Sequence, residues 1–467
     1  MPKHVKKWFI FCLTILCSTT SIGVFAKIDN AKIKSLQQMS LESSLSYEIV
    51  ESLTVEVGPR LPGSPADLKT VAWAEAKFKA LNYDKIYKEP VEIPVWTRGA
   101  ASAEITAPFP QPIVITALGG SVATPDEGIE AEIVRFDNIE QLQQADSKLV
   151  EGKIVFIDPI TERHRTGKGY GKVVGARSKG AVESAKKGAL AVVIRSIGTD
   201  SDRFAHTGMM RYSDDTIKIP AAAMSVPDAN QVNAMLDRGQ PVRIKMNLSP
   251  ASKGVASSYN VIGEITGSTY PDEIILLGAH HDSWDEGTGA LDDGAGVGIV
   301  MATGALIKKH SVQPKRTIRV VLYAAEEIGL IGGKAYAKAH EKELDKHRFA
   351  LESDFGAGLI WRLDTRVNPA ALEDMKNIAR MLEPLGIEMG HNNAGGGPDI
   401  SMLPGYGVPV INLQQDGSDY FDYHHTPNDT LDKIDPAKIA QNTTAWVTFA
   451  VMAAEVDAQL RPIPERK

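Results

Sequence analysis

Apolar segments of two kinds alternate from residue 258 to the end of the chain. Short runs that are almost continuously apolar predict buried strands, and longer segments with apolar residues at helical spacing predict helices. The predicted strands are 274–279, 317–325, 348–352 and 408–413, and the predicted helices are 295–308, 331–339, 370–385 and 436–460. Strands that are apolar on both faces and alternate with helices are typical of an α/β sheet covered on both sides. We therefore expect a mixed, mostly parallel sheet sandwiched by helices.

The pattern differs in the stretch before residue 250. The elements it predicts there are strands at 153–158 and 188–194 and helices at 178–187 and 227–237. The clusters of histidine and carboxylate side chains described below do not fall in this stretch. We therefore predict a β-rich domain over residues 111–250, inserted into a larger domain that comprises residues 27–110 and 251–467.

The first 26 residues have the pattern of a secretory signal. Lysines precede an apolar run at 8–17, and Val24-Phe25-Ala26 provides small residues for cleavage after Ala26. The run is short for a membrane span, although a single membrane anchor is the alternative. We expect an exported protein, periplasmic or secreted, with no stable membrane insertion after cleavage. Both cysteines, Cys12 and Cys17, lie in this segment, so the mature chain would have no disulfide.

Composition and charge exclude several classes of protein. The chain has 467 residues, of which 43% are hydrophobic, and this is enough to bury a sizeable core. It carries 51 basic and 58 acidic residues, for a formal net charge of −7. A moderately acidic protein is a poor candidate for binding nucleic acid or an anionic membrane. We therefore expect a soluble globular protein that does not bind nucleic acid.

Polar clusters follow the carboxyl ends of the predicted strands. In chain order they are His280-His281-Asp282, Asp292-Asp293, Glu326-Glu327, Asp354 and His424-His425. Each cluster alone could be a capped strand end, a helix start or a surface feature. Because ligands bind outside the carboxyl ends of the strands in open α/β sheets, four matched strand ends predict one shared site.

The donor types in these clusters indicate which metal the site would hold. Imidazole and carboxylate without thiolate suit zinc, with Co²⁺ and Mn²⁺ as alternatives. Three carboxylates and a bridging hydroxide would balance the charge of two divalent ions. A carboxylate shared by both would hold them roughly 3.5–4 Å apart, the spacing at which two metal ions act as a pair. The residues therefore predict two Zn²⁺.

Five motifs in this order resemble those of the secreted zinc aminopeptidases. They are Gly278–Ser283, Gly289–Gly296, Glu326–Leu330, Glu352–Asp354 and His425–Thr430. Within that family, the phrases at 280–285 and 351–354 look closest to the plasma glutamate carboxypeptidase (carboxypeptidase Q) group. The resemblance covers essentially the whole mature chain and implies the zinc exopeptidase fold. The insert resembles the protease-associated domain found in the same group.

This resemblance assigns roles to individual residues. The implied metal ligands are His280, Asp292, Glu327, Asp354 and His425. Asp292 would bridge the metals, with His280 and Asp354 on one and Glu327 and His425 on the other. Glu326 would be the general base, and Asp282 would orient His280 through its far ring nitrogen. Asp293 would follow a cis peptide bond, as it does in relatives.

Several placements stay open at this point. The family pattern favours His425 as the ligand, but the adjacent His424 is a live alternative. Side chains alternate along a strand, so His281 should point away from its neighbours. Asp399 could hold a substrate ammonium or cap a helix. The remaining candidates are Tyr420 and Tyr423, which could contact a reaction intermediate or simply pack, and Arg163, His164 and Arg165, which we interpret as a solvated loop.

The leading functional hypothesis is an exopeptidase that acts on dipeptides or on unblocked peptide N-termini. Relatives of this kind often form homodimers. One alternative is a non-catalytic binding protein, such as the transferrin receptors, which keep this architecture but have lost metal ligands. Another is glutaminyl cyclase, which uses a related fold with one zinc. The complete ligand set and the pair Glu326-Glu327 favour two-metal hydrolysis.

Overall fold

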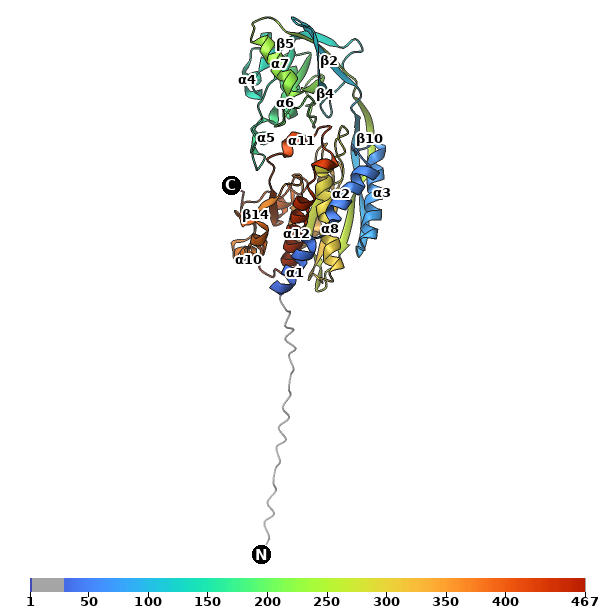
Figure 1. Cartoon of the computed structure of the whole chain (residues 1–467), viewed down its shortest axis with the longest axis vertical. Helices are drawn as coiled ribbons and strands as arrows, with labels where there is room; N and C mark the ends of the chain where they lie inside the picture. Colours follow the sequence, from blue (N-terminus) through green and yellow to red (C-terminus); the bar gives the residue numbers. More distant parts are fainter. Residues whose placement is uncertain (2–28, 467) are drawn as a thin grey trace.

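The computed structural model describes Met1 and residues 29–466, so the predicted signal peptide lies outside the described residues apart from Met1. The chain forms two lobes, each built around its own eight-stranded sheet (Figure 1). Residues 101–248 form the second lobe, drawn in cyan and green, and the remaining described residues form the first.

The sheet of the first lobe is mixed. Its strand order is β1-β10-β12-β11-β13-β16-β14-β15. The strands are β1 Lys85–Thr97, β10 Ala251–Ile265, β11 Tyr270–His280, β12 Arg316–Tyr323, β13 His347–Glu352, β14 Ile360–Arg366, β15 Glu388–Met389 and β16 Val410–Gln415. The four central strands, β12, β11, β13 and β16, are parallel, whereas β10 runs antiparallel to β1 and β12, and β14 runs antiparallel to β16. The four strands predicted from apolar runs are these parallel ones, so their carboxyl ends share one edge.

Helices cover both faces of this sheet. The larger buried cluster packs under α1 Asn30–Leu41, α2 Leu45–Glu56, α3 Pro65–Ala80, α8 Ala295–Lys309, α10 Leu372–Leu382 and α12 Pro436–Ala453. The opposite face packs under α9 Ile331–Ala339 and two short 3₁₀ turns, Glu341–Lys346 and Leu403–Tyr406. The sandwich expected from the sequence is confirmed in this lobe.

Helix α8 lies at the centre of the larger cluster. Together with the preceding turn it is the one helical segment among residues 29–466 that is long and apolar enough to cross a membrane, and its residues from Ala290 to Ile307 are buried inside the protein. Its small residues allow close packing, since a Cβ on Gly298 would lie 2.6 Å from the carbonyl oxygen of Ser46 in α2. This packing fixes the turn that precedes α8, which carries Asp292 and Asp293.

The second lobe has strand order β3-β2-β9-β5-β6-β7-β8-β4. Its strands are β2 Ala101–Ala107, β3 Gln111–Ile113, β4 Ile115–Ala117, β5 Ile129–Phe136, β6 Ile154–Ile157, β7 Ala191–Arg195, β8 Ala221–Met224 and β9 Arg243–Leu248. Its helices are α4 Ile139–Gln144, α5 Lys168–Val173, α6 Gly175–Ala185 and α7 Val226–Leu236. Two separate apolar clusters pack against this sheet, so the lobe has a core of its own. It begins at Ala101, ahead of the boundary at residue 111 that the sequence suggests, and its likeness to a protease-associated domain stays a prediction.

Two long strands connect the lobes. β1 and β10 pair antiparallel from Lys85↔Glu264 to Thr97↔Ala251, and Figure 1 shows β10 running from the first lobe into the second. The apolar pattern does not reveal them, because much of their length is exposed and polar and β1 contains Pro90 and Pro94. The last helix also differs from expectation, since α12 ends at Ala453 rather than at residue 460.

Candidate metal centre

The first group of donors comes from the ends of two neighbouring strands and one turn. His280 is the last residue of β11, Asp354 follows β13, and Asp292 lies in the turn Ala290–Gly294. The Nε2 atom of His280 is 3.2 Å from Oδ1 of Asp292 and 3.5 Å from Oδ1 of Asp354. These three side chains offer ligand atoms that all lie within 4.8 Å of one another.

The second group shares the other oxygen of Asp292. The Nε2 atom of His425 is 3.3 Å from Oδ2 of Asp292 and 3.0 Å from Oε2 of Glu327. Burial opposes the charge on Asp292, but its hydrogen bonds with His280 and His425 outweigh it and hold the pKa of this carboxyl well below its usual range. Asp292 therefore presents one carboxylate oxygen to each group.

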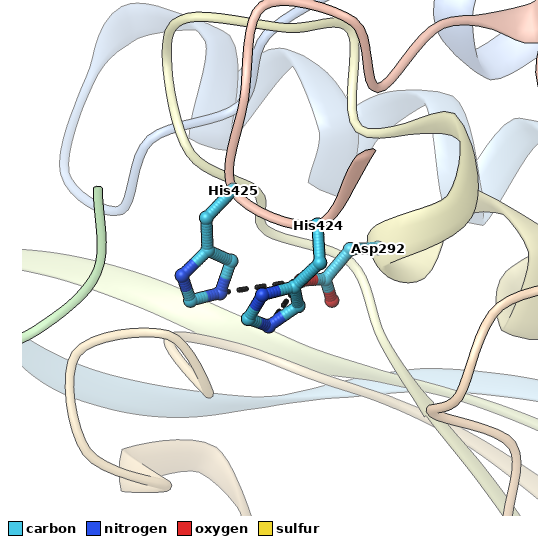
Figure 2. Close-up of side chains that lie close together, drawn as sticks. All are labelled: Asp292, His424 and His425. Carbon is cyan, nitrogen blue, oxygen red and sulfur yellow. Dashed lines mark ion pairs between the residues drawn. The ribbon is translucent and has the colours of Figure 1, made fainter. Parts of the chain in front are cut away.

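The two adjacent histidines have different surroundings. Both lie near Oδ2 of Asp292, with Nε2 of His424 at 3.5 Å, and their rings are stacked with centroids 3.5 Å apart (Figure 2). Burial and the neighbouring ring of His425 hold the pKa of His424 well below its usual value. Burial also lowers the pKa of His425, but the carboxylates of Glu327 and Asp292 outweigh it and raise the value to about 9. His425 therefore lies against two carboxylates, those of Asp292 and Glu327, whereas His424 lies near that of Asp292.

Asp282 contacts residues of both donor groups. Its Oδ1 atom lies 3.5 Å from Nδ1 of His280, and its backbone carbonyl oxygen lies 3.2 Å from the same nitrogen. The same carboxylate accepts hydrogen bonds from the backbone N–H groups of Glu326 at 3.1 Å and Glu327 at 3.2 Å. One buried side chain therefore positions a histidine at the end of β11 and the turn after β12.

Glu326 lies on that turn and is half-buried at the wall of the cleft. Burial raises its pKa well above the ordinary carboxyl value, and the carboxylates of Asp354 and Glu327 raise it further. The neighbouring Glu327 is buried, and its Oε1 atom has no hydrogen-bond partner among the described residues. A buried carboxylate oxygen without a partner is expected where a cation completes the site.

The turn that carries Asp292 is held by residues that the sequence did not single out. The Asp292–Asp293 peptide bond is cis, as the family resemblance implied. Asp429 accepts hydrogen bonds from the backbone N–H groups of Leu291 at 2.6 Å and Asp292 at 3.1 Å. The fully buried Arg60 donates to the carbonyls of Gly58, His281, Thr288 and Gly289.

The second lobe touches the metal centre directly, although the sequence placed no site residue in it. The Nδ1 atom of His425 lies 3.2 Å from the carbonyl oxygen of Thr207, and the N–H of Thr207 donates back to the His425 carbonyl. The ring of His206 contacts the carbonyl of His424 at 2.9 Å. Both histidines are therefore fixed by an extended segment from the other lobe.

Arg163 and Arg165 of the charged loop at 163–165 are exposed to solvent, as interpreted from the sequence, and they also bridge the lobes. Arg163 forms two hydrogen bonds with Asp422, at 2.6 and 2.9 Å, and Arg165 pairs with Asp416 at 2.8 Å. Sequence spacing could not reveal these pairs, because their partners lie more than two hundred residues away along the chain.

A cleft of about 860 Å³ lies between the lobes and contains the metal centre. Its first-lobe wall includes Asp292, Glu326, Glu327, Asp354, Tyr420, His424 and His425. Pro398 also lines it, but Asp399 is buried and accepts from the N–H of Gly333, so this carboxylate does not face the cleft. Tyr423 and His281 are not lining residues either, and His281 points away toward the carbonyl of Tyr259 as expected.

Comparison with known proteins shows which family the chain resembles. The family model for peptidase family M28 matches residues 260–450. Carboxypeptidase Q from Mus musculus is 36% identical over 415 residues, which cover 89% of this chain and 87% of that protein. The crystal structure of a peptidase M28 precursor from Shewanella amazonensis is similar with a TM-score of 0.93 and 58% identity, covering 94% of this chain and 99% of that one.

A more distant structure shares the fold. BSAP, a zinc aminopeptidase from Bacillus subtilis, has a TM-score of 0.60 at 20% identity and covers 87% of this chain and 95% of its own. The identity and coverage of the nearer relatives, together with the shared fold, lead to one conclusion. The chain belongs to peptidase family M28 and is a metallopeptidase.

Proposed function

We propose that this metallopeptidase is a two-zinc exopeptidase that hydrolyses dipeptides or releases N-terminal residues from unblocked peptides. The observation that carries the proposal is the position of Asp292, whose two oxygens face two separate groups of donors. His280 and Asp354 complete one group, and His425 and Glu327 complete the other. The secretory pattern of residues 1–26 supports export of this activity.

The donor chemistry fits two zinc ions. Each group combines one imidazole with carboxylates and contains no thiolate, which suits Zn²⁺, with Co²⁺ and Mn²⁺ as alternatives. The unpartnered Oε1 atom of Glu327 and the shared carboxylate of Asp292 are both accounted for by bound cations. Asp282 would fix His280 and the glutamate turn whether or not the ions are bound.

The side chains supply the proton transfers of peptide hydrolysis. A zinc pair, when bound, supplies Lewis-acid polarisation of the scissile carbonyl and acidifies a water molecule. Glu326 accepts the proton of the attacking water and then donates it to the leaving amine, whose C–N bond breaks. Glu326 can serve both transfers because it lines the cleft and directly precedes the proposed ligand Glu327.

The Glu326→Gln variant tests this proposal. We expect it to keep the fold and about two zinc ions per chain, while kcat falls by about 10²–10⁴-fold, the range of a general base. Elemental analysis, thermal unfolding and a panel of a dipeptide, an N-blocked peptide and an aminoacyl anilide measure these outcomes, with and without chelator. Glu341→Gln, an exposed glutamate outside the cleft, is the matched control.

Three results would contradict parts of the proposal. Substantial turnover in Glu326→Gln would remove the base assignment. One zinc per chain with full activity would remove the co-catalytic pair, and efficient cleavage of the N-blocked peptide would remove the exopeptidase assignment.

A further inference from the structure

A second cavity, of about 350 Å³, lies beside the cleft, where the connecting strands β1 and β10 meet the second lobe. Its walls include Leu61 from the first lobe, Trp96 from β1 and Val122 from the second lobe. Met209 and Tyr212 line both this cavity and the cleft, so they lie between the two spaces. The residues that we assign to metal binding and proton transfer are not among its lining residues. The cavity is therefore distinct from the catalytic cleft, and its size is that of a small-molecule site.

The walls of this cavity are mostly apolar. Trp96 and Trp284 meet edge to face, with ring centroids 6.4 Å apart, and most of the other lining side chains are aliphatic. The indole N–H of Trp96 donates to the carbonyl of Ser121 at 3.0 Å. The hydroxyl of Tyr212 donates to the carbonyl of Ile219 at 2.6 Å. Trp96 and Tyr212 therefore offer ring surface rather than hydrogen bonds to an occupant of the cavity.

One charged side chain, that of Lys218, lines the cavity. Lys218 is exposed to solvent, and its Nζ atom lies 5.6 Å from the centre of the Tyr212 ring, so the ammonium stands at the mouth of the cavity. Among the residues that the structure describes, no carboxylate forms an ion pair with Lys218, and none of the lining residues is Asp or Glu. This charge distribution favours an anionic group on the occupant and disfavours an ammonium group. A peptide with an unblocked N-terminus is therefore a poor occupant.

We propose that this cavity binds a small apolar monocarboxylate, such as a medium-chain fatty acid. The apolar chain packs against Trp96 and Trp284, and the carboxylate lies at Lys218. Each methylene buried in such a cavity strengthens binding by about fourfold. The ion pair at the exposed lysine adds a smaller contribution that salt weakens. The inference goes beyond the proposed peptidase function, because this binding requires neither zinc nor a peptide.

The cavity is connected to the metal centre through its wall. The ring of Trp284 lies against that of His425, with centroids 5.7 Å apart. The guanidinium of Arg98 lies 5.5 Å from the centre of the Trp284 ring, and its Nη1 atom donates to Oγ1 of Thr207 at 2.8 Å. A bound carboxylate therefore packs on a residue that contacts a proposed zinc ligand, from outside the cleft. Its effect on hydrolysis should not be competitive with the substrate.

Isothermal titration calorimetry with hexanoate, octanoate and octylamine tests the proposal, on the zinc-loaded protein and again after chelation. We expect octanoate to bind at one saturable site, about tenfold more tightly than hexanoate and equally well without zinc. Octylamine should bind at least about threefold more weakly than octanoate at low salt.

Two variants at exposed positions locate the site. Ser252→Trp fills the cavity from its wall and should weaken octanoate binding by about tenfold or more. Lys218→Gln should weaken octanoate by about threefold and leave octylamine no weaker than in the wild type. Lys148→Gln, an exposed lysine of the same lobe outside the cavity, is the matched control and should keep the wild-type affinities.

Several results would overturn the proposal. Absence of saturable octanoate binding to the wild type would remove the site, even if no variant folds. Octylamine binding as tight as that of octanoate would remove the assigned ligand class. Loss of octanoate binding after chelation, or competitive inhibition of dipeptide hydrolysis, would place the carboxylate at the metal centre instead. Unchanged octanoate affinity in Ser252→Trp would place it elsewhere on the protein.

Discussion

Gly208 allows the second lobe to approach the metal centre, and replacing it should weaken zinc binding from outside the ligand set. Its φ is +132°, and a Cβ at this position would lie 2.2 Å from Nη1 of Arg177 and 2.7 Å from Nδ1 of His425. The flexible guanidinium can move aside, but the imidazole is held by Glu327, Asp292 and the stacked His424. The Gly208→Ala variant must therefore displace either the ring of His425 or the 205–208 segment.

The expected loss of folding stability in Gly208→Ala has two causes. A non-glycine residue at such a φ costs on the order of 1–3 kcal/mol, and overlap in a packed region adds about 1–3 kcal/mol. Loss of the contact between the Thr207 carbonyl and Nδ1 of His425 should lower zinc affinity by about 10–100-fold, as for other partners of metal-binding histidines. The stability loss and the affinity loss both follow from the added Cβ and should appear together.

Competition with a chromophoric chelator measures the zinc affinity, and thermal unfolding of the metal-free chain measures stability. Gly239→Ala is the matched control, since Gly239 lies in the same lobe, has φ +73° and has nothing within 4 Å of the position that a Cβ would occupy. It should lose some stability and keep the wild-type zinc affinity. Equal zinc affinity in Gly208→Ala and Gly239→Ala would refute the idea that the second lobe supports the metal centre.

Two further predictions concern buried polar groups. In Asp282→Asn, an amide N–H₂ replaces one acceptor of the backbone N–H groups of Glu326 and Glu327, so zinc affinity and kcat should each fall by about 10–100-fold; unchanged chelator competition would contradict this. Burial lowers the pKa of His347 to about 3 from its ordinary 6.5, so the unfolded chain binds the extra proton first as pH falls. The free energy of unfolding should therefore fall as pH is lowered from 6.5 to 3, by up to about 1.4 kcal/mol per pH unit. Urea unfolding of the wild type measures this dependence on pH, and His347→Gln should make it less steep. An equal dependence in both proteins would show that other groups titrate.

The sequence was most informative where the sheet is parallel and buried. Strands β11, β12, β13 and β16 are apolar on both faces, and their shared edge follows from their parallel direction. The convergence of His280, Asp354 and Glu327 could therefore be predicted from position alone. Asp292 needed the family resemblance, because nothing in its local pattern shows which of two aspartates faces the cleft.

Contacts between the lobes could not be predicted in the same way. The acceptor at Nδ1 of His425 is a main-chain carbonyl, which any residue at position 207 would provide, so it leaves no signature in the side-chain pattern. Arg60 likewise acts on four carbonyls, and only its place in a loop rich in glycine and proline distinguishes it. Asp399 follows a proline that does line the cleft, and only the fold shows that its carboxylate turns inward.

The paired strands β1 and β10 carry the chain into and out of the second lobe side by side, with Thr97 opposite Ala251. Two chain ends so close together are where an extra domain can be accommodated without disturbing its host, and a tight hairpin could rejoin them. Yet a chain shortened in this way would lose the Thr207 carbonyl behind His425 and one wall of the cleft. The second lobe is therefore connected to the chain as an inserted domain that could be deleted, but its contacts with His425 and with the cleft make it part of the candidate site.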